Sequence, residues 1–452
     1  MPQLQLLGGL PGHAEPAWCV TFNPTRNLLA SCSTDRSIRL YSYTLPSPSP
    51  SDSTSFPSSS DSKPSFSLNK VIDTDHKRTV RSVAWSPDGR TLASGSFDST
   101  VGVWEEVIPE SDEEDDNEAG NQGVYRPAAG ADEEDDDDDD GISGKEKEWE
   151  CVTTLEGHES ECKSVGFSSD GALLASCSRD KSVWVWEVQP DADFECIAVM
   201  MEHSQDVKCI AWHPHEEVLA SASYDSHIHL AFDDPDSDWT IFQKAHPKMP
   251  PAPLTIPSTS ASSLIAALMP TAEEKAAEQK LVVPPLEEDE TIWSLAWSPC
   301  GRYLASGGDM GGVRIWQRRG TQPDSPFEEI LHTAAHSRSV FSLSWTPSPS
   351  TPSTSETDLG LLASAGGDGK IIIWQVQLGT PSTNGHEPSE SESEGHKQVL
   401  QIRPIAAVKD AHGVSDVNAV GWCVRDDKKG LGLLSSAGDD GSVKVWRIVS
   451  DE

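Results

Sequence analysis

The stretch LLASCSRDKSVWVW, residues 173–186, determines the fold, because the same pattern returns along the chain. Small and aliphatic residues lead into a tight polar turn, and a second run ends in an aromatic residue; this pattern is typical of a β-hairpin. The other copies are LLASCSTDRSIRLY (28–41), TLASGSFDSTVGVW (91–104), VLASASYDSHIHLA (218–231), YLASGGDMGGVRIW (303–316), LLASAGGDGKIIIW (361–374) and LLSSAGDDGSVKVW (433–446). The chain therefore repeats one structural unit seven times.

Two more strands complete each unit. Before each hairpin lies a short apolar run that ends near an aromatic residue, such as SVAW (82–85) or CIAW (209–212), and a fourth run precedes the next unit, as in 149–158. Four strands with a period of about 40 to 45 residues are typical of WD40 repeats, and the sequence resembles that family over nearly its whole ordered length. We predict an all-β fold, a seven-bladed WD40 β-propeller that is a single domain over residues 1–452.

The two ends of the chain indicate how the ring closes. The last unit stops after its third strand, near residues 446–449, whereas a spare strand, 3–10, precedes the first unit. We predict that this N-terminal strand completes the last blade, because an unpaired sheet edge would invite aggregation.

A histidine stands 22 residues before the turn aspartate in four units, for example His158 before Asp180. In the WD40 family such groups hydrogen-bond within a blade, so the resemblance implies a structural role. The residues concerned are His13, Asp35, His76, Asp98, Trp104, His158, Asp180, Trp186, His203, Asp225, Asp368, Trp374, His412, Asp440 and Trp446. Acid–base catalysis fits poorly, because a constellation repeated in every unit cannot be one active site.

Units four and five depart from the pattern. Ala231 stands where the aromatic residue is expected, and Met310 stands at the turn aspartate position. Glu288 occupies the 22-residue offset in unit five, and His246 is a candidate displaced histidine. We expect these two blades to be the least tightly closed.

The formal net charge of -39 argues against direct nucleic-acid binding and against docking on anionic lipid, since both need a cationic face. Residues 105–140 hold 18 acidic residues and one basic residue, so -17 lies there and -22 in the remainder. We interpret this acidic run as a solvated linker rather than as the working element of a histone chaperone.

Cysteine and histidine usage predicts neither a metal site nor a cofactor. The nine cysteines include no CxxC pair and lie mostly in apolar runs, which indicates buried reduced thiols. His213 with His215, and His227 with His229, are spaced by two, but no carboxylate or thiol completes either pair, so we expect exposed histidines. Residues 1–10 lack the features of a signal peptide, and no apolar run could span a membrane, so we expect a cytoplasmic or nuclear protein.

Low-complexity insertions interrupt the repeats, and we expect them to be disordered. They lie near 46–67, 105–146, 247–287, 346–357 and 379–397. Only 247–287 joins consecutive blades, whereas the others fall in loops that open on the opposite face of a propeller. The face with the shorter turns is therefore the candidate binding surface.

Residues 150–188, which include SRDKSVWVWEV (178–188), and the phrase HSQDVK (203–208) closely resemble the cytosolic iron-sulfur protein assembly protein 1 family. The resemblance implies a non-enzymatic scaffold of the cytosolic iron-sulfur targeting complex. Its implied partners are a small partner subunit, a HEAT-repeat subunit, a hydrogenase-like iron-sulfur carrier and client apoproteins. The chain has no cluster-ligating cysteine spacing of its own, so we expect no bound cofactor.

Arg179 stands out beside the structural Asp180, because the family uses the matching arginine on its surface. We expect it to pair with a partner carboxylate; the alternative is a local salt bridge with Asp180 or another turn acid. The other predicted partner-binding residues are Lys181, Gln205, Asp206, Tyr224, Arg81 and Trp293.

Two other WD40 functions remain open. The chain could be a substrate receptor of a cullin-type ubiquitin ligase, or a histone-binding chaperone. An enzyme is unsupported, because the sequence has no P-loop, nucleophile elbow or zinc motif.

Overall fold

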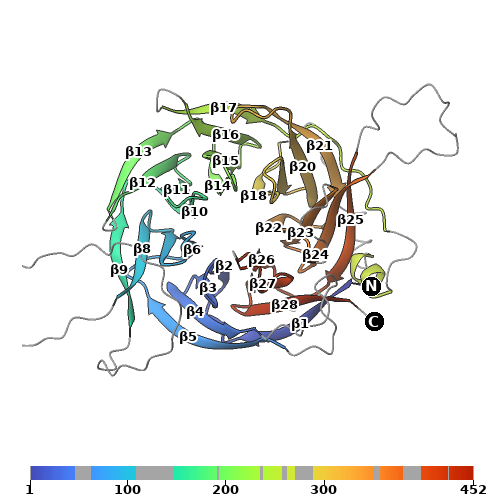
Figure 1. Cartoon of the computed structure of the whole chain (residues 1–452), viewed down its shortest axis with the longest axis horizontal. Helices are drawn as coiled ribbons and strands as arrows, with labels where there is room; N and C mark the ends of the chain where they lie inside the picture. The colour runs from blue at the N-terminus through green and yellow to red at the C-terminus, as the bar shows by residue number, and fades with distance from the viewer. Residues whose placement is uncertain are drawn as a thin grey trace, which may run out of the picture.

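The structure is a computed structural model that describes residues 2–45, 63–107, 147–190, 193–234, 238–256, 262–269, 289–349, 357–379, 399–425 and 427–450. In this part of the chain, 28 strands form seven four-stranded antiparallel sheets. The sheets stand around a central axis like the blades of a propeller, with β2, β6, β10, β14, β18, β22 and β26 innermost (Figure 1). The predicted seven-bladed β-propeller is confirmed.

Each of the first six blades is built from four consecutive strands, innermost first. Blade 1 holds β2 (Ala17–Phe22), β3 (Leu28–Ser33), β4 (Ser37–Thr44) and β5 (Ser65–Asp73). Blade 2 holds β6 (Val80–Trp85), β7 (Thr91–Ser96), β8 (Val101–Val107) and β9 (Glu148–Leu155). Blade 3 holds β10 (Cys162–Phe167), β11 (Leu173–Ser178), β12 (Val183–Val188) and β13 (Phe194–Met200). Blade 4 holds β14 (Val207–Trp212), β15 (Val218–Ser223), β16 (Ile228–Asp233) and β17 (Trp239–Ala245). Blade 5 holds β18 (Ile292–Trp297), β19 (Tyr303–Gly308), β20 (Gly312–Arg318) and β21 (Phe327–Ala334). Blade 6 holds β22 (Val340–Thr346), β23 (Asp358–Gly366), β24 (Ile371–Gly379) and β25 (Val399–Val408).

The seventh blade joins the two ends of the chain. It consists of β26 (Val417–Trp422), β27 (Leu433–Gly438), β28 (Val443–Ser450) and, outermost, the N-terminal strand β1 (Pro2–Leu10). β1 pairs with β28 in an antiparallel register that runs from Pro2 opposite Ser450 to Leu10 opposite Val443. The predicted closure by the N-terminal strand is confirmed, and the two termini lie near each other (Figure 1).

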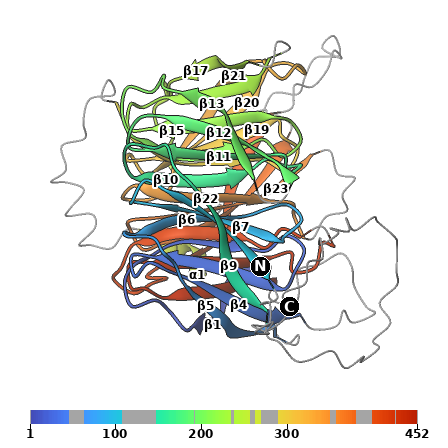
Figure 2. The same ribbon diagram turned by 90° about the vertical axis from the view of Figure 1, so that its left-hand side faces the viewer.

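The core lies between the blades. The buried apolar residues of the described chain form seven clusters, and each cluster is shared by two neighbouring blades. Ala30 and Cys32 of blade 1, for example, are fully buried in one cluster with Val83 of blade 2. Seen from the side, the blades stack face to face around the ring (Figure 2). Each blade therefore needs both neighbours to bury its two faces.

The insertions lie mostly outside the described residues, but their ends are visible. Of the stretches named above, residues 65–67 begin β5, 105–107 end β8, Thr346 ends β22 and Gly379 ends β24. Part of 247–287 is ordered rather than disordered: Ala252 forms a parallel bridge with Thr333, and the helix α1 (Ser262–Leu268) buries Leu264 and Leu268 in the cluster between blades 5 and 6. Apolar side chains of this stretch therefore pack against the ring.

A polar network ties the loop into each regular blade to the turn of that blade. In blade 3, His158 Nδ1 donates to the Asp180 carboxylate (2.9 Å), and His158 Nε2 lies 2.8 Å from Ser176 Oγ. Trp186 Nε1 donates to the same hydroxyl at 3.3 Å. The other histidine–aspartate pairs are His13–Asp35, His76–Asp98, His203–Asp225, His336–Asp368 and His412–Asp440. Indole donors equivalent to Trp186 are Trp104, Trp316, Trp374 and Trp446.

The 22-residue offset did not identify the histidine of blade 6 or the residue at the loop position of blade 5. His336 pairs with Asp368 across 32 residues, because the insertion between β22 and β23 lengthens the offset. In blade 5 the loop position belongs to Glu290, which is buried and accepts from Arg314 Nε at 2.9 Å, whereas His246 pairs with Asp289. Glu288 lies outside the described residues. Blades 4 and 5 are both complete four-stranded sheets, so the expected looser closure is not observed in their strand pairing.

Candidate partner-binding surface

One face of the ring is formed by the turns between the second and third strands of the blades and by the loops that join consecutive blades. We call it the Arg179 face. In the turn of blade 3, the backbone N–H of Arg179 donates to the carbonyl of Glu161 at 2.9 Å. The same bond joins Phe97 to Thr79 and Tyr224 to Asp206, both at 2.9 Å. These backbone bonds fix the residue that precedes each turn acid at the edge of the face.

The second residue of each innermost strand forms a ring of side chains around the axis next to this edge. These residues are Trp18, Arg81, Lys163, Lys208, Trp293, Phe341 and Asn418, which we call the axial ring. Because each innermost strand occupies the same place in its blade, equivalent positions far apart in the sequence meet here. Cations and aromatic rings dominate the set.

The cations of the axial ring lie against aromatic rings. The Arg81 guanidinium is 4.8 Å from the ring centre of Trp18, and the Lys163 ammonium is 4.0 Å from that of Phe97. Lys208 lies 5.2 Å from the ring centre of Tyr224 and 5.0 Å from that of Trp293. Such contacts are attractive within about 6 Å. They order long side chains that would otherwise be flexible.

Arg179 is a weakly constrained cation near this ring. Its side chain is 57% exposed, and its nearest carboxylate oxygens, on Glu161 and Asp206, are 3.7 and 3.8 Å away. Glu161 is already bound by Lys163 at 2.7 Å and Arg78 at 2.9 Å. Burial alone would raise the pKa of Glu161, but hydrogen bonds and charge contacts with Lys163 and Arg78 lower it below its usual range. Arg179 therefore keeps donors available for another carboxylate.

The structure brings most of the predicted binding residues together. Arg81 and Trp293 belong to the axial ring, and Tyr224 and Asp206 contact Lys208. Lys181 and Gln205 also lie on the Arg179 face. The backbone N–H of Lys181 donates to the carbonyl of Ser178, and the carbonyl of Gln205 accepts from the Ser223 hydroxyl, so each bond stays within one blade. Asp180 is engaged by His158, so the local carboxylates near Arg179 are Glu161 and Asp206.

Several residues of the surface escaped the sequence analysis. They are Trp18, Phe97, Lys163, Lys208 and Phe341. A signal was present: aligning the seven units places Trp18, Lys163, Lys208 and Phe341 in the column that also holds Arg81 and Trp293. Reading that column would have identified the axial ring.

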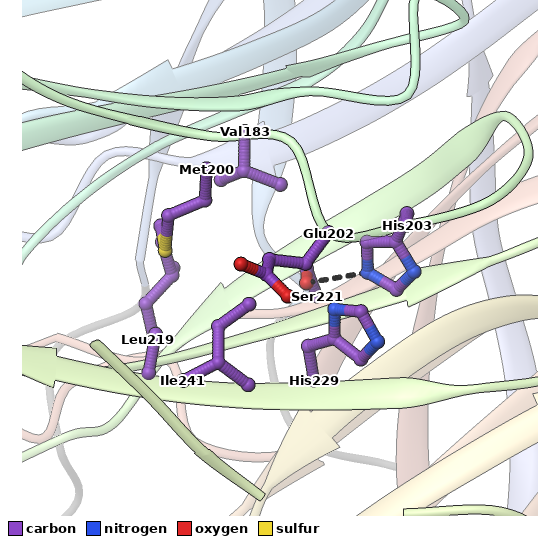
Figure 3. Close-up of a pocket in the computed structure, with 9 residues that line it drawn as sticks. Val183, Met200, Glu202, His203, Leu219, Ser221, His229 and Ile241 are labelled. Carbon is purple, nitrogen blue, oxygen red and sulfur yellow. Dashed lines mark hydrogen bonds between the residues drawn. The ribbon is translucent and has the colours of Figure 1, made fainter. Parts of the chain in front are cut away.

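Blade 4 contains a buried cluster of His203, Asp225 and His229, whose ligand atoms lie within 4.8 Å of one another. The two imidazole rings and Ala231 line a cavity of about 10 Å³. Figure 3 shows the rings of His203 and His229 side by side. The ring centres are 3.6 Å apart and the planes differ by 7°. Stacked parallel rings direct their nitrogen lone pairs into separate planes, which does not suit a shared metal ion. The His229 ring instead packs beside Ala231, which stands where other blades carry a tryptophan indole.

The paired histidines of blade 4 are less exposed than expected. His213 and His229 are 2% and 3% exposed, so the expectation that both are exposed is wrong. His213 Nε2 bonds to the carbonyl of Gly301 at 3.0 Å, which anchors blade 4 to blade 5. Burial, together with the neighbouring His203, lowers the pKa of His229 to about 3, so its ring is uncharged at neutral pH. His229 Nδ1 is buried without a hydrogen-bond partner.

Comparison with known proteins shows the class of protein to which the chain belongs. Residues 4–42, 68–105, 149–187, 194–230, 285–317, 328–375 and 405–447 match the WD40 family, described as WD domain, G-beta repeat. The chain is therefore a WD40-repeat β-propeller protein. Among the described residues, no helix has the length and apolar character needed to cross a membrane.

Relatives identify the particular family. The chain is 74% identical to a protein of Cryptococcus neoformans var. neoformans serotype D (strain JEC21) over the whole length of both. It is 42% identical to one of Mycosarcoma maydis, over 99% of this chain and 93% of the relative, and 34% identical to one of Aspergillus flavus, over 98% of each. All three carry the name "Probable cytosolic iron-sulfur protein assembly protein 1". The chain belongs to the cytosolic iron-sulfur protein assembly protein 1 family.

Proposed function

We propose that the chain is a non-catalytic scaffold of the cytosolic iron-sulfur protein assembly machinery and helps to transfer clusters to cytosolic and nuclear apoproteins. The names of its relatives and its WD40 propeller support this role. The partners we propose are a small partner subunit, a HEAT-repeat subunit, a hydrogenase-like iron-sulfur carrier and the client apoproteins. The scaffold would act in the cytosol and also in the nucleus.

The observation that carries the proposal is Arg179, an exposed guanidinium beside an ordered set of cations and aromatic rings. Arginine and aromatic residues are the commonest anchors of protein interfaces, because they bury large surfaces in defined geometries. A guanidinium can also bind a carboxylate through two parallel hydrogen bonds. We therefore assign the binding of an acidic group on a partner to Arg179, with Arg81, Lys163 and Lys208 adding positive charge nearby.

Charge distribution supports this assignment. The chain carries -39 overall, whereas the Arg179 face concentrates cations around the axis. Complementary charge speeds the encounter of two proteins and disfavours wrong partners. A partner that presents a carboxylate would thus be directed to this part of an otherwise acidic molecule. Lys181, Gln205, Asp206, Tyr224 and Trp293 are the remaining residues that we propose to contact partners.

The test is affinity purification of the full chain and of an Arg179→Glu variant, with mass spectrometry of the bound proteins. We expect the variant to lose the small partner subunit and the HEAT-repeat subunit, with an unchanged melting temperature. Arg319→Glu is the matched control, because Arg319 is also exposed and paired with a surface glutamate but lies just past β20, at the opposite face. Unchanged recovery of both subunits with Arg179→Glu would contradict the proposal.

A further inference from the structure

Two cysteines face each other in blade 1. Cys19 of β2 and Cys32 of β3 are directly opposite in the antiparallel register, immediately after a bulge. Opposed residues project their side chains to the same face of the sheet, so the two thiols are neighbours. Directly opposed residues on antiparallel strands have Cα atoms about 4.5 to 5.5 Å apart, and disulfides need about 4.4 to 6.8 Å. The Cα separation of this pair therefore lies within the range that a disulfide needs.

The other blades show that this pairing is specific to blade 1. At the same register the residue pairs are Ser82–Gly95, Ser164–Cys177, Cys209–Ala222, Ser294–Gly307, Ser342–Ala365 and Ala419–Ala437. All are small, because the neighbouring blade packs closely; a Cβ on Gly95 would approach Val165 Cγ1 to 2.9 Å. Packing accepts serine, alanine or glycine at this register, so it does not by itself require two thiols.

The two sulfurs differ in reactivity. Cys32 is fully buried, whereas Cys19 is partly exposed and its thiol lies 3.6 Å from the carbonyl of Val83. The neighbouring Cys32 thiol lowers the pKa of Cys19 to about 7, with smaller contributions from the Val83 backbone and Arg81. The thiolate is the nucleophilic form of cysteine, so Cys19 can react at neutral pH. Burial and the neighbouring Cys19 thiol raise the pKa of Cys32.

We propose that Cys19 and Cys32 form a redox-active pair that a peroxide oxidises to a disulfide within blade 1. The Cys19 thiolate attacks one oxygen of hydrogen peroxide, the O–O bond breaks, and hydroxide leaves to take up a proton as water. The sulfur of Cys32 then attacks the Cys19 sulfenic acid, its thiol proton is lost, and the S–O bond breaks with release of a second water. Two thiols and one peroxide thus give one disulfide and two waters.

The position also explains why the bond would be reversible. Opposed side chains in a sheet hold their Cβ atoms about 4.5 to 5.5 Å apart, wider than the mean of about 3.8 Å in relaxed disulfides. Strained disulfides are more easily reduced. A nearby resolving thiol also protects a sulfenic acid from further oxidation. The pair would therefore cycle between dithiol and disulfide in a reducing compartment.

The experiment uses the full-length protein. It is treated with hydrogen peroxide, unfolded, alkylated and digested for mass spectrometry. We expect a peptide pair linked through Cys19 and Cys32, which dithiothreitol separates. Cys19→Ser and Cys32→Ala should each abolish that link. Both substitutions copy residues that other blades carry at the same register, so the fold should accept them.

Cys209→Ser and Cys177→Ala are the matched controls, since each removes a single thiol at the same register of another blade, and both should keep the link. Recovery of Cys19 and Cys32 as alkylated thiols after peroxide would overturn the proposal. Conversion of Cys19 to a sulfinic acid without a linked peptide, or its linkage to a different cysteine, would overturn it equally. The mapping on the wild-type chain decides the question even if a variant folds poorly.

Discussion

Blades 3 and 5 connect the incoming loop to the hairpin through different side chains. In blade 3, His158 in the incoming loop donates to Asp180 in the turn, and Ser176 lies between this histidine and Trp186. In blade 5, Trp316 still donates to Ser306 at 2.9 Å. The loop, however, supplies a carboxylate, Glu290, and the third strand supplies the donor, Arg314. The repeat therefore requires a buried donor–acceptor pair between loop and hairpin rather than particular residues.

The two solutions differ in how much charge they bury. Arg314 and Glu290 are 5% and 8% exposed, and Arg314 also bonds to Glu329 at 2.5 Å and to the carbonyl of Met249 at 2.9 Å. That last contact uses the segment that follows β17, so the insertion before blade 5 takes part in the network. Blade 3 relies on a histidine and a single carboxylate. We expect blade 5 to be the more sensitive to loss of one partner.

The largest effect should follow from Arg314→Met. This change leaves Glu290 and Glu329 buried without their cation, and breaking a buried ion pair costs about 3 to 5 kcal/mol. Urea denaturation should show a loss of that size in the free energy of unfolding. Arg319→Met, which removes an exposed partner of Glu328, should change it by less than about 1 kcal/mol. A loss below about 1 kcal/mol for Arg314→Met would show that the carboxylates are rehydrated.

The next largest effect should be a difference between the two blades in how acid pH changes the free energy of unfolding. Burial, with the Arg314 charge, lowers the pKa of His332 in blade 5 from 6.5 to about 4. Between these values the unfolded chain binds a proton that the folded chain does not, so the free energy of unfolding falls as the pH falls. His332→Gln should reduce that decline by up to about 1.4 kcal/mol per pH unit. Equal slopes in the variant and the wild type would argue against a buried neutral His332.

The matching change in blade 3 acts in a different pH window. Burial alone would raise the pKa of Asp180, but hydrogen bonds from His158 and Ser182 lower it well below its usual range. Its contribution to stability is present above the unfolded value of about 3.9 and is lost as the pH falls toward the lower folded value. Asp180→Asn should therefore remove the loss of stability that Asp180 causes in the wild type below about pH 4, as pH-dependent urea denaturation can verify.

A smaller effect tests what the blades share. Trp186→Phe and Trp316→Phe each remove an indole donor to a buried serine. A lost hydrogen bond of this kind costs about 1 kcal/mol, so the two variants should lose similar amounts in urea denaturation. A clearly larger loss in one blade would mean that its serine depends on the indole more than the geometry indicates.

The smallest expected effect concerns Arg179. Its ion pairs in the turn region of blade 3 are long and exposed, and such pairs contribute about 0 to 1 kcal/mol. Arg179→Ala should leave the thermal unfolding curve nearly unchanged. A substantial loss would assign Arg179 to the stability of blade 3 and weaken its proposed role in binding.

Much of the architecture was predictable, because its signals are local. The strand–turn–strand copies, the 22-residue spacing of His158 and Asp180, and the spare strand at residues 3–10 each follow from short-range hairpin and sheet chemistry. Changes in loop length defeated the spacing argument: an insertion inside the unit lengthened the offset of His336, and the segment from Glu290 to β18 is two residues shorter than that from His158 to β10. A fixed offset cannot survive a change in loop length.

The sequence by itself determined the seven blades, the closure of the ring and the position of Arg179 in a turn. Only the tertiary structure decided what meets around the axis: Lys208 lies against Trp293 from the next blade, and Arg81 lies over Trp18. It also decided that α1 packs between blades 5 and 6. The physical reason is that hairpins form from neighbouring residues, whereas contacts between blades exist only once the ring has closed.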